Sequence, residues 1–226
     1  MPQSSCQNTA RQRLEKALGV IIPGGELTFQ RLPDCPALEL LLLDAHYPQQ
    51  GLTAEDVQRV MDNPLYWVFC WASGQVLARR LLDNPAWVAG RRVLDFGAGS
   101  GVAGIAAKLA GAKDVIACDQ DPMALESCAV NARRNGVEIA LADDFDQVSG
   151  AVDLIVVADV LYDRGNFPWL ERFVERSPRV LIADSRVRDF DYPPYRQVAT
   201  QDSCTLPDLD ESQEFRHVKL YLAGTL

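Results

Sequence analysis

The chain has 226 residues, of which 48% are hydrophobic and 23% charged, and its formal net charge is −9 at pH 7. This length suits one well-buried domain with a modest extra segment, and the composition excludes disordered, fibrous and collagen-like classes. The negative charge is the wrong sign for a protein that gains affinity by neutralising phosphates, so we expect no nucleic-acid substrate.

The sequence shows no targeting, membrane or metal signal. Its first six residues lack a basic region followed by an apolar stretch, and no apolar run approaches the ~20 residues of a spanning helix. The six cysteines form no CxxC pair, and only two histidines are present. We therefore expect a cytoplasmic protein with reduced thiols, no metal site and no membrane partner.

The first 64 residues predict a small extension of short helices and a strand. Residues 10–18 predict a helix closed by Gly19, and residues 26–32 alternate like a strand that Pro33 stops. A second helix is expected from Thr53, with Asp56 completing a capping box. We assign residues 1–64 to this N-terminal extension and residues 65–226 to the main domain.

From Val93 onward, buried β-runs alternate with helical stretches. This pattern predicts an α/β fold in which helices cover both faces of a doubly wound, mostly parallel sheet. The five expected strands are residues 92–95, 114–119, 137–141, 153–158 and 179–184. Two further strands, residues 195–200 and 215–222, are expected to form an antiparallel pair at the sheet edge.

The helix between the second and third strands has consistent start and stop signals. Asp121 is the expected cap, Pro122 the first helical residue, and Gly136 lies just past the end. For Asp121 this capping role is preferred over a role in ligand binding.

A glycine-rich turn, Asp95-Phe96-Gly97-Ala98-Gly99-Ser100-Gly101, follows the first strand. Residues 99–104 also match GxGxxG, which leaves a dinucleotide open. A pyrophosphate needs bare amides, whereas Asp95 adds a negative charge there. S-adenosylmethionine carries an ammonium, a sulfonium and a carboxylate, so an acid beside glycine amides suits it better. We therefore predict S-adenosylmethionine as cofactor, with the backbone of the turn approaching it closely.

Further cofactor contacts are expected where the next strands end. Asp119 can accept hydrogen bonds from both ribose hydroxyls, which either cofactor would offer. Asp143 or Asp144 could reach the adenine amino group or form a solvated turn, and Asp143 is the residue we select. The complete set predicted from this region is Asp95, Gly97, Ala98, Gly99, Gly101, Asp119, Gln120, Asp143 and Ala158.

With these features in place, residues 93–222 resemble the seven-stranded methyltransferase fold. Residues 65–79 (LYWVFCWASGQVLAR) and 82–85 (LDNP) resemble the segment ahead of the glycine turn in the lysine methyltransferases of the electron-transfer flavoprotein β-subunit. Residues 159–162 (DVLY) match the DxxY signature of the wider protein methyltransferase family. The resemblance implies that Trp71 lies beside the cofactor and that Asp159 faces the substrate amine.

The alternative for Trp67 and Trp71 is a pair of core aromatic residues four positions apart on one helix face, which is preferred for Trp67. In the mechanism we expect, Asp159 orients the amine while Trp71 and Tyr162 desolvate it, and S-adenosylhomocysteine is the product. Tyr162 could equally pack beneath the cleft.

Several functions remain open from the sequence. The resemblance favours a protein substrate that presents lysine, possibly the electron-transfer flavoprotein β-subunit. The alternatives are a small-molecule amine of the nicotinamide type and a non-catalytic cofactor-binding module. A nucleic-acid methyltransferase is disfavoured, because residues 158–162 lack the NPPY or DPPY sequence of enzymes that methylate base amino groups.

Overall fold

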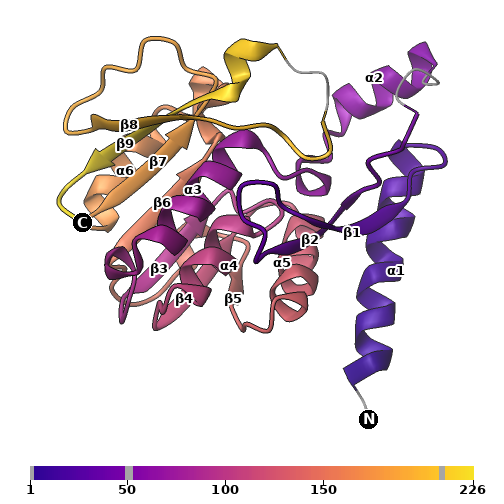
Figure 1. Ribbon diagram of the computed structural model, residues 1–226, viewed down its shortest axis with the longest axis horizontal. Coiled ribbons are helices and arrows are strands. Elements are labelled where there is room, and N and C mark those ends of the chain that lie inside the picture. Colours follow the sequence, from indigo (N-terminus) through magenta and orange to yellow (C-terminus); the bar gives the residue numbers. More distant parts are fainter. Residues whose placement is uncertain (1–2, 49–52, 209–211) are drawn as a thin grey trace.

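The computed structural model describes residues 3–48, 53–208 and 212–226, and its centre is one seven-stranded sheet (Figure 1). The strand order is β5-β4-β3-β6-β7-β9-β8. The five parallel strands are β3 (Arg92–Phe96), β4 (Asp114–Cys118), β5 (Ala140–Ala142), β6 (Leu154–Ala158) and β7 (Val180–Asp184). Antiparallel β9 (His217–Ala223) pairs with β7, and β8 (Arg196–Asp202) forms the edge. The predicted fold is confirmed.

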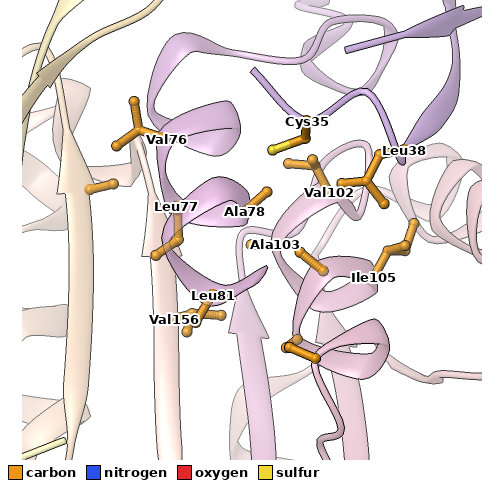
Figure 2. Packing of buried hydrophobic residues seen from close by; sticks show 14 of the residues in the cluster. Cys35, Leu38, Val76, Leu77, Ala78, Leu81, Val102, Ala103, Ile105 and Val156 are labelled. Atoms are coloured by element: carbon orange, nitrogen blue, oxygen red, sulfur yellow. The ribbon is translucent and has the colours of Figure 1, made fainter. Parts of the chain in front are cut away.

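Helices cover both faces of this sheet, as the buried strands require. The four helices of the main domain are α3 (Ala72–Asp83), α4 (Val102–Leu109), α5 (Pro122–Arg134) and α6 (Trp169–Arg176). Successive residues of β3 show the alternation, because Val93 packs in the cluster that contains α3 and α4 while Leu94 packs with α6. Figure 2 shows the first of these clusters, with Leu77, Ala78, Leu81, Val102, Ala103, Ile105 and Val156 labelled.

Local signals placed the ends of several elements correctly. The capping box of Thr53 and Asp56 begins α2 (Ala54–Asp62). Asp121 caps α5 by accepting a hydrogen bond from the backbone N–H of Met123, and Gly136 has φ +71° just beyond the helix. The third predicted strand is shorter than expected: residues 137–139 lie outside it, and β5 begins at Ala140.

The N-terminal region differs from the expectation in two ways. Helix α1 (Gln3–Ile21) runs through Gly19, because buried Leu18 and Ile22 hold its last turn and outweigh the low helix propensity of glycine. Two strands are present instead of one: β1 (Leu27–Arg31) pairs with β2 (Glu39–Leu43). The leucines of β2 alternate between two hydrophobic clusters, so this strand is buried on both faces and shows no polar alternation.

The predicted shared helix for Trp67 and Trp71 is wrong. Trp67 lies in the 3-10 turn Tyr66–Val68, and Trp71 is the N-cap of α3. Trp67 is nevertheless a core residue, 1% exposed, as was predicted for it. No helix among the described residues is long and apolar enough to cross a membrane.

Asn131 of α5 joins the N-terminal hairpin to the glycine turn. Its side-chain oxygen accepts a hydrogen bond from the backbone N–H of Leu41 at 2.7 Å, and its nitrogen donates to the carbonyl of Ser100 at 2.9 Å. Asn131 is fully buried, so both backbone partners depend on it. One amide therefore holds the extension and the glycine turn in register.

Replacing Asn131 with alanine should lower the free energy of unfolding by about 2–4 kcal/mol, because two buried backbone groups lose their partner. Urea denaturation followed by circular dichroism measures this loss. Exposed Arg133 on the same helix supplies the control, since Arg133→Ala should change stability by less than about 0.5 kcal/mol. Equal stability of the two variants would contradict the role given to Asn131.

Candidate functional site

A cavity of about 1590 Å³ opens where the parallel strands end. Most of the predicted site residues line it, namely Trp71, Gly97, Ala98, Gly99, Asp119, Gln120, Asp143, Ala158, Asp159 and Tyr162. Asp95 and Gly101 do not belong to this lining. The carboxyl edge of a parallel sheet is the usual ligand site of such folds, because the loops that follow the strands converge there.

The glycine turn has a backbone that other residues adopt with strain. Gly97 and Gly99 have φ values of +67° and +53°. A Cβ on Gly97 would lie 2.6 Å from Cγ2 of Val160, so no side chain fits there. Gly101 differs from the expectation, since a Cβ there would meet Cys128 of α5. Gly101 therefore allows the turn to pack closely against α5.

Asp95 also has a different role from the predicted one. Its side chain is 2% exposed, and Oδ2 accepts a hydrogen bond from the backbone N–H of Gly104 at 2.7 Å. Burial raises the pKa of Asp95 to about 7. Asp95 thus supports the first turn of α4 from inside the protein. Its carboxyl group does not line the cavity, which differs from the prediction.

Asp119 lies at the end of β4, where it both shapes the loops and faces the cavity. Its two oxygens accept hydrogen bonds from the backbone N–H groups of Gly99 at 2.9 Å and Asp121 at 3.0 Å. Burial raises its pKa. Each carboxylate oxygen has a second lone pair, so Asp119 can also accept hydrogen bonds from a ligand.

Asp143 and Asp144, which the sequence did not separate, differ in their contacts. Asp144 caps the 3-10 turn Phe145–Gln147 and accepts hydrogen bonds from the backbone N–H of Asp146 and from the side chain of Gln147. Within the described part of the chain, the Asp143 side chain has no hydrogen bond. Both residues line the cavity, and Asp143 has the carboxylate that is less committed to its own turn.

Asp159 follows β6 with φ +51°, a left-handed conformation that is costly for a residue other than glycine. Its Oδ1 accepts three hydrogen bonds, from the hydroxyl of Ser73 at 2.7 Å and from the N–H and hydroxyl of Ser185 at 3.0 and 2.9 Å. Its Oδ2 is buried and has no partner among the described residues. Burial raises the pKa of Asp159, while these hydrogen bonds oppose the shift.

Aromatic rings surround this part of the cavity. The ring of Tyr66 lies 5.4 Å from that of Tyr162 and 6.1 Å from that of Trp71. Tyr162 is 54% exposed, so it stands at the mouth and does not pack beneath the cleft. Its pKa is raised to about 12, chiefly by burial, which keeps the phenol neutral. A buried acceptor beside aromatic faces favours a cationic ligand.

Sequence reasoning missed several residues of this site. Tyr66 lies within the segment that carries the resemblance, but no motif singles it out. Ser73 and Ser185 reach Asp159 from positions 86 and 26 residues away, and Arg186 lines the same cavity. The N-terminal extension also contributes to the lining, through Ala17, Val20, Ile21, Asn63 and Pro64. Among the described residues, no cluster of His, Cys, Asp or Glu could hold a metal ion.

Comparisons with known proteins relate the chain to methyltransferases. A family model for ribosomal protein L11 methyltransferase (PrmA) matches residues 78–164. The electron transfer flavoprotein beta subunit lysine methyltransferase of Mus musculus is 40% identical over 127 residues, which cover 53% of this chain and 50% of that protein. Its counterpart from Xenopus laevis is 35% identical over 159 residues, covering 66% and 65%. The chain thus spans only part of the length of these relatives.

A solved structure supports the fold alone. The T. thermophilus 16S rRNA N2 G1207 methyltransferase (RsmC), in complex with AdoMet and guanosine, superimposes with a TM-score of 0.56 at 13% identity, covering 89% of this chain and 51% of that chain. The predicted methyltransferase fold and the predicted resemblance to the flavoprotein lysine methyltransferases are confirmed. The chain is therefore similar in sequence to protein methyltransferases over part of its length and has the methyltransferase fold.

The burial of Asp95 gives a prediction about the pH dependence of stability. Because its pKa rises to about 7 on folding, from about 3.9 in an unfolded chain, its contribution to stability is complete below pH 4 and is lost as the pH rises through 7. Between pH 4 and pH 8, the free energy of unfolding of Asp95→Asn should therefore increase by a few kcal/mol relative to that of the parent protein. Denaturation at both pH values measures this change, and a pH-independent difference would contradict it.

Proposed function

We propose that the chain is an S-adenosylmethionine-dependent N-methyltransferase that methylates lysine side chains of a protein substrate. The observation that carries the proposal is Asp159, whose Oδ2 is buried without a partner among the described residues and which lines the same cavity as Tyr66, Trp71 and Tyr162. A carboxylate oxygen among aromatic faces is suited to a primary ammonium group. The names of the relatives support lysine as the target and suggest the electron-transfer flavoprotein β-subunit as substrate.

The residues present fit the proposed cofactor. Gly97 and Gly99 line the cavity, and a Cβ on Gly99 would meet only the carbonyl oxygen of Gly97, at 4.0 Å, so the backbone there is open to the amino-acid end of the cofactor. Asp119 keeps free lone pairs for the ribose hydroxyls, and Asp143 has a carboxylate available for the adenine amino group. In this proposal Trp71, Ala98, Gln120 and Ala158 line the remainder of the cofactor site. Asp95 and Gly101 lie outside the proposed cofactor site, because neither lines the cavity.

When bound, S-adenosylmethionine supplies a methyl group on a positively charged sulfur. The protein then has to align the amine with that carbon and to exclude water. In the proposed arrangement Asp159 orients the amine through Oδ2, while Ser73 and Ser185 hold Oδ1 by hydrogen bonds. Tyr162 and Tyr66 shield the amine from solvent. No nucleophilic side chain is needed, because the substrate nitrogen attacks directly.

The N-terminal extension completes the mouth of the cavity in this proposal. Residues 1–64 contribute Val20, which is 63% exposed, and Ile21 from α1, together with Asn63 and Pro64 just beyond α2. We propose that this wall, attached to the domain at residues 65–226, contacts the protein substrate. The cavity of about 1590 Å³ leaves space for a substrate segment beside the cofactor.

The test is mass spectrometry of recombinant electron-transfer flavoprotein β-subunit after incubation with the enzyme and S-adenosylmethionine. We expect additions of 14 Da, the mass of one methyl group, that localise to lysine after digestion. A parallel incubation with nicotinamide and related amines distinguishes a small-molecule enzyme. Methyl transfer to those amines alone would reject the protein substrate, and tight cofactor binding without any turnover would reject catalysis.

Replacing Asp159 with asparagine should lower kcat/KM by about 100-fold or more, because the amide cannot offer the ammonium a charged acceptor. The affinity for S-adenosylmethionine, measured by calorimetry, should change less than threefold. The matched control is Asp83→Asn, an exposed residue at the C-terminal end of α3 that pairs with Arg79, and this variant should keep its activity. Full turnover in Asp159→Asn would refute the assigned role.

Replacing Gly97 with alanine should weaken S-adenosylmethionine binding by about tenfold or more, because the added Cβ combines a positive φ with the collision against Val160. Gly136→Ala supplies the control, since its φ is +71° but nothing lies within 4 Å. That variant should lose stability and keep its affinity. Adding Val160→Ala to Gly97→Ala should restore part of the affinity, and unchanged binding in Gly97→Ala would contradict the proposed cradle.

A further inference from the structure

Arg186 lies on the loop after β7, and its guanidinium points over two aromatic rings of the site. Its Cζ lies 4.1 Å from the ring centre of Phe215 and 5.5 Å from that of Trp71. Among the described residues that line the cavity, Arg186 is the only one with a cationic side chain. Arg186 therefore lines the same cavity in which the proposed function places an ammonium group.

A short, hydrogen-bonded loop fixes Arg186 relative to Asp159. Oδ1 of Asp184 accepts hydrogen bonds from the backbone N–H groups of Arg186 at 2.8 Å and Val187 at 2.7 Å. The neighbouring Ser185 donates both its N–H and its hydroxyl to Asp159. The loop that carries Arg186 is therefore hydrogen-bonded to the Asp159 carboxylate, and the charge of Arg186 acts on both Asp159 and Asp184.

The proposed reaction creates a need for such a charge. A lysine amine has a pKa of about 10.4, and the Asp159 carboxylate stabilises its protonated form further. The amine must release a proton to solvent before its lone pair can form the new carbon–nitrogen bond while the carbon–sulfur bond breaks. A cation held nearby lowers the pKa of an amine and favours the neutral nucleophile. Arginine suits this task, because its guanidinium keeps its charge even when it is paired.

We propose that Arg186 is a charge-tuning residue that lowers the pKa of the bound substrate amine and so offsets the effect of Asp159. This inference rests on the proposed function. Among the described residues, the titratable and charged groups of this region are Asp159, Asp184, Tyr66, Tyr162, Asp119 and Asp163, together with the exposed Arg188–Glu214 ion pair. Most of these groups are acids, so removing Arg186 makes the net charge of the region more negative.

The first test is the dependence of kcat on pH at saturating flavoprotein β-subunit and S-adenosylmethionine, because kcat reports the ionisation of the bound complex. In Arg186→Gln the acidic limb should move upward by about 0.5 to 1 pH unit. The rate should fall about three- to tenfold at pH values below the limb and recover toward the parent rate above it. Arg186→Lys, which keeps the charge, should leave the limb near its original position.

The matched control is Arg188→Gln, which removes a positive charge two residues away from Arg186. The Arg188 side chain is 81% exposed and paired with Glu214. The acidic limb of this variant should not move. A uniform loss of rate at every pH in Arg186→Gln would overturn the inference, since that outcome indicates a packing or docking role. An equal shift in Arg188→Gln would overturn it as well.

The second test needs no turnover and separates this inference from the proposed function. Carbon-13 NMR of labelled aspartate side chains, with Asp159→Asn identifying the Asp159 resonance, follows the titration of that carboxyl group. Removing Arg186 should raise the pKa of Asp159, whereas Arg188→Gln should not. Failure of the parent protein to methylate any substrate would refute the proposed function, while an unshifted Asp159 titration in Arg186→Gln would refute the charge-tuning role.

Discussion

Buried aspartates at the carboxyl edge of the parallel sheet determine the geometry of this site. The strands β3, β4, β6 and β7 each have one at or just past their last residues, and they are Asp95, Asp119, Asp159 and Asp184. Burial raises the pKa of all four. Each carboxyl group accepts at least one hydrogen bond from a backbone N–H, which belongs to α4 for Asp95 and to loops after the strands for the other three. The loops that form the cavity are therefore folded around carboxyl groups, which compensate part of their desolvation through these bonds.

This acidic edge also explains which ligands the cavity can hold. Asp119, Asp143 and Asp159 line it together with aromatic rings, so a sulfonium and an ammonium are favoured over a pyrophosphate. The same conclusion was reached from the sequence through Asp95, but the structure assigns that residue to the support of α4. The negative charge in the cavity comes from the acids that follow the other strands and not from Asp95.

The sequence predicted the features that depend on neighbours along the chain. Strand positions, the Asp121 cap and the glycine turn follow from local hydrophobic patterns, capping residues and the backbone freedom of glycine. It did not predict β2, because a strand buried on both faces lacks polar alternation. Ser73 and Ser185 could not be found either, since the packing of α3 brings Ser73 to Asp159 and the pairing of β6 with β7 brings Ser185 there. Arg186 belongs to no motif, and its position depends on Asp184 and on the ring of Phe215.

In the proposed reaction, Asp159 just past β6 and Asp184 at the end of β7 have two roles that one carboxylate could not combine. An acid that binds an ammonium tightly also holds its proton, so a site with Asp159 alone would favour the unreactive form of the amine. Asp184, one strand away, does not line the cavity, and it orients the loop that carries both Ser185 and Arg186. That loop delivers a hydrogen-bond donor to Asp159 and a fixed positive charge to the same cavity. Because both contributions come from adjacent residues, binding of the amine and the balance of its charge are fixed by the same backbone.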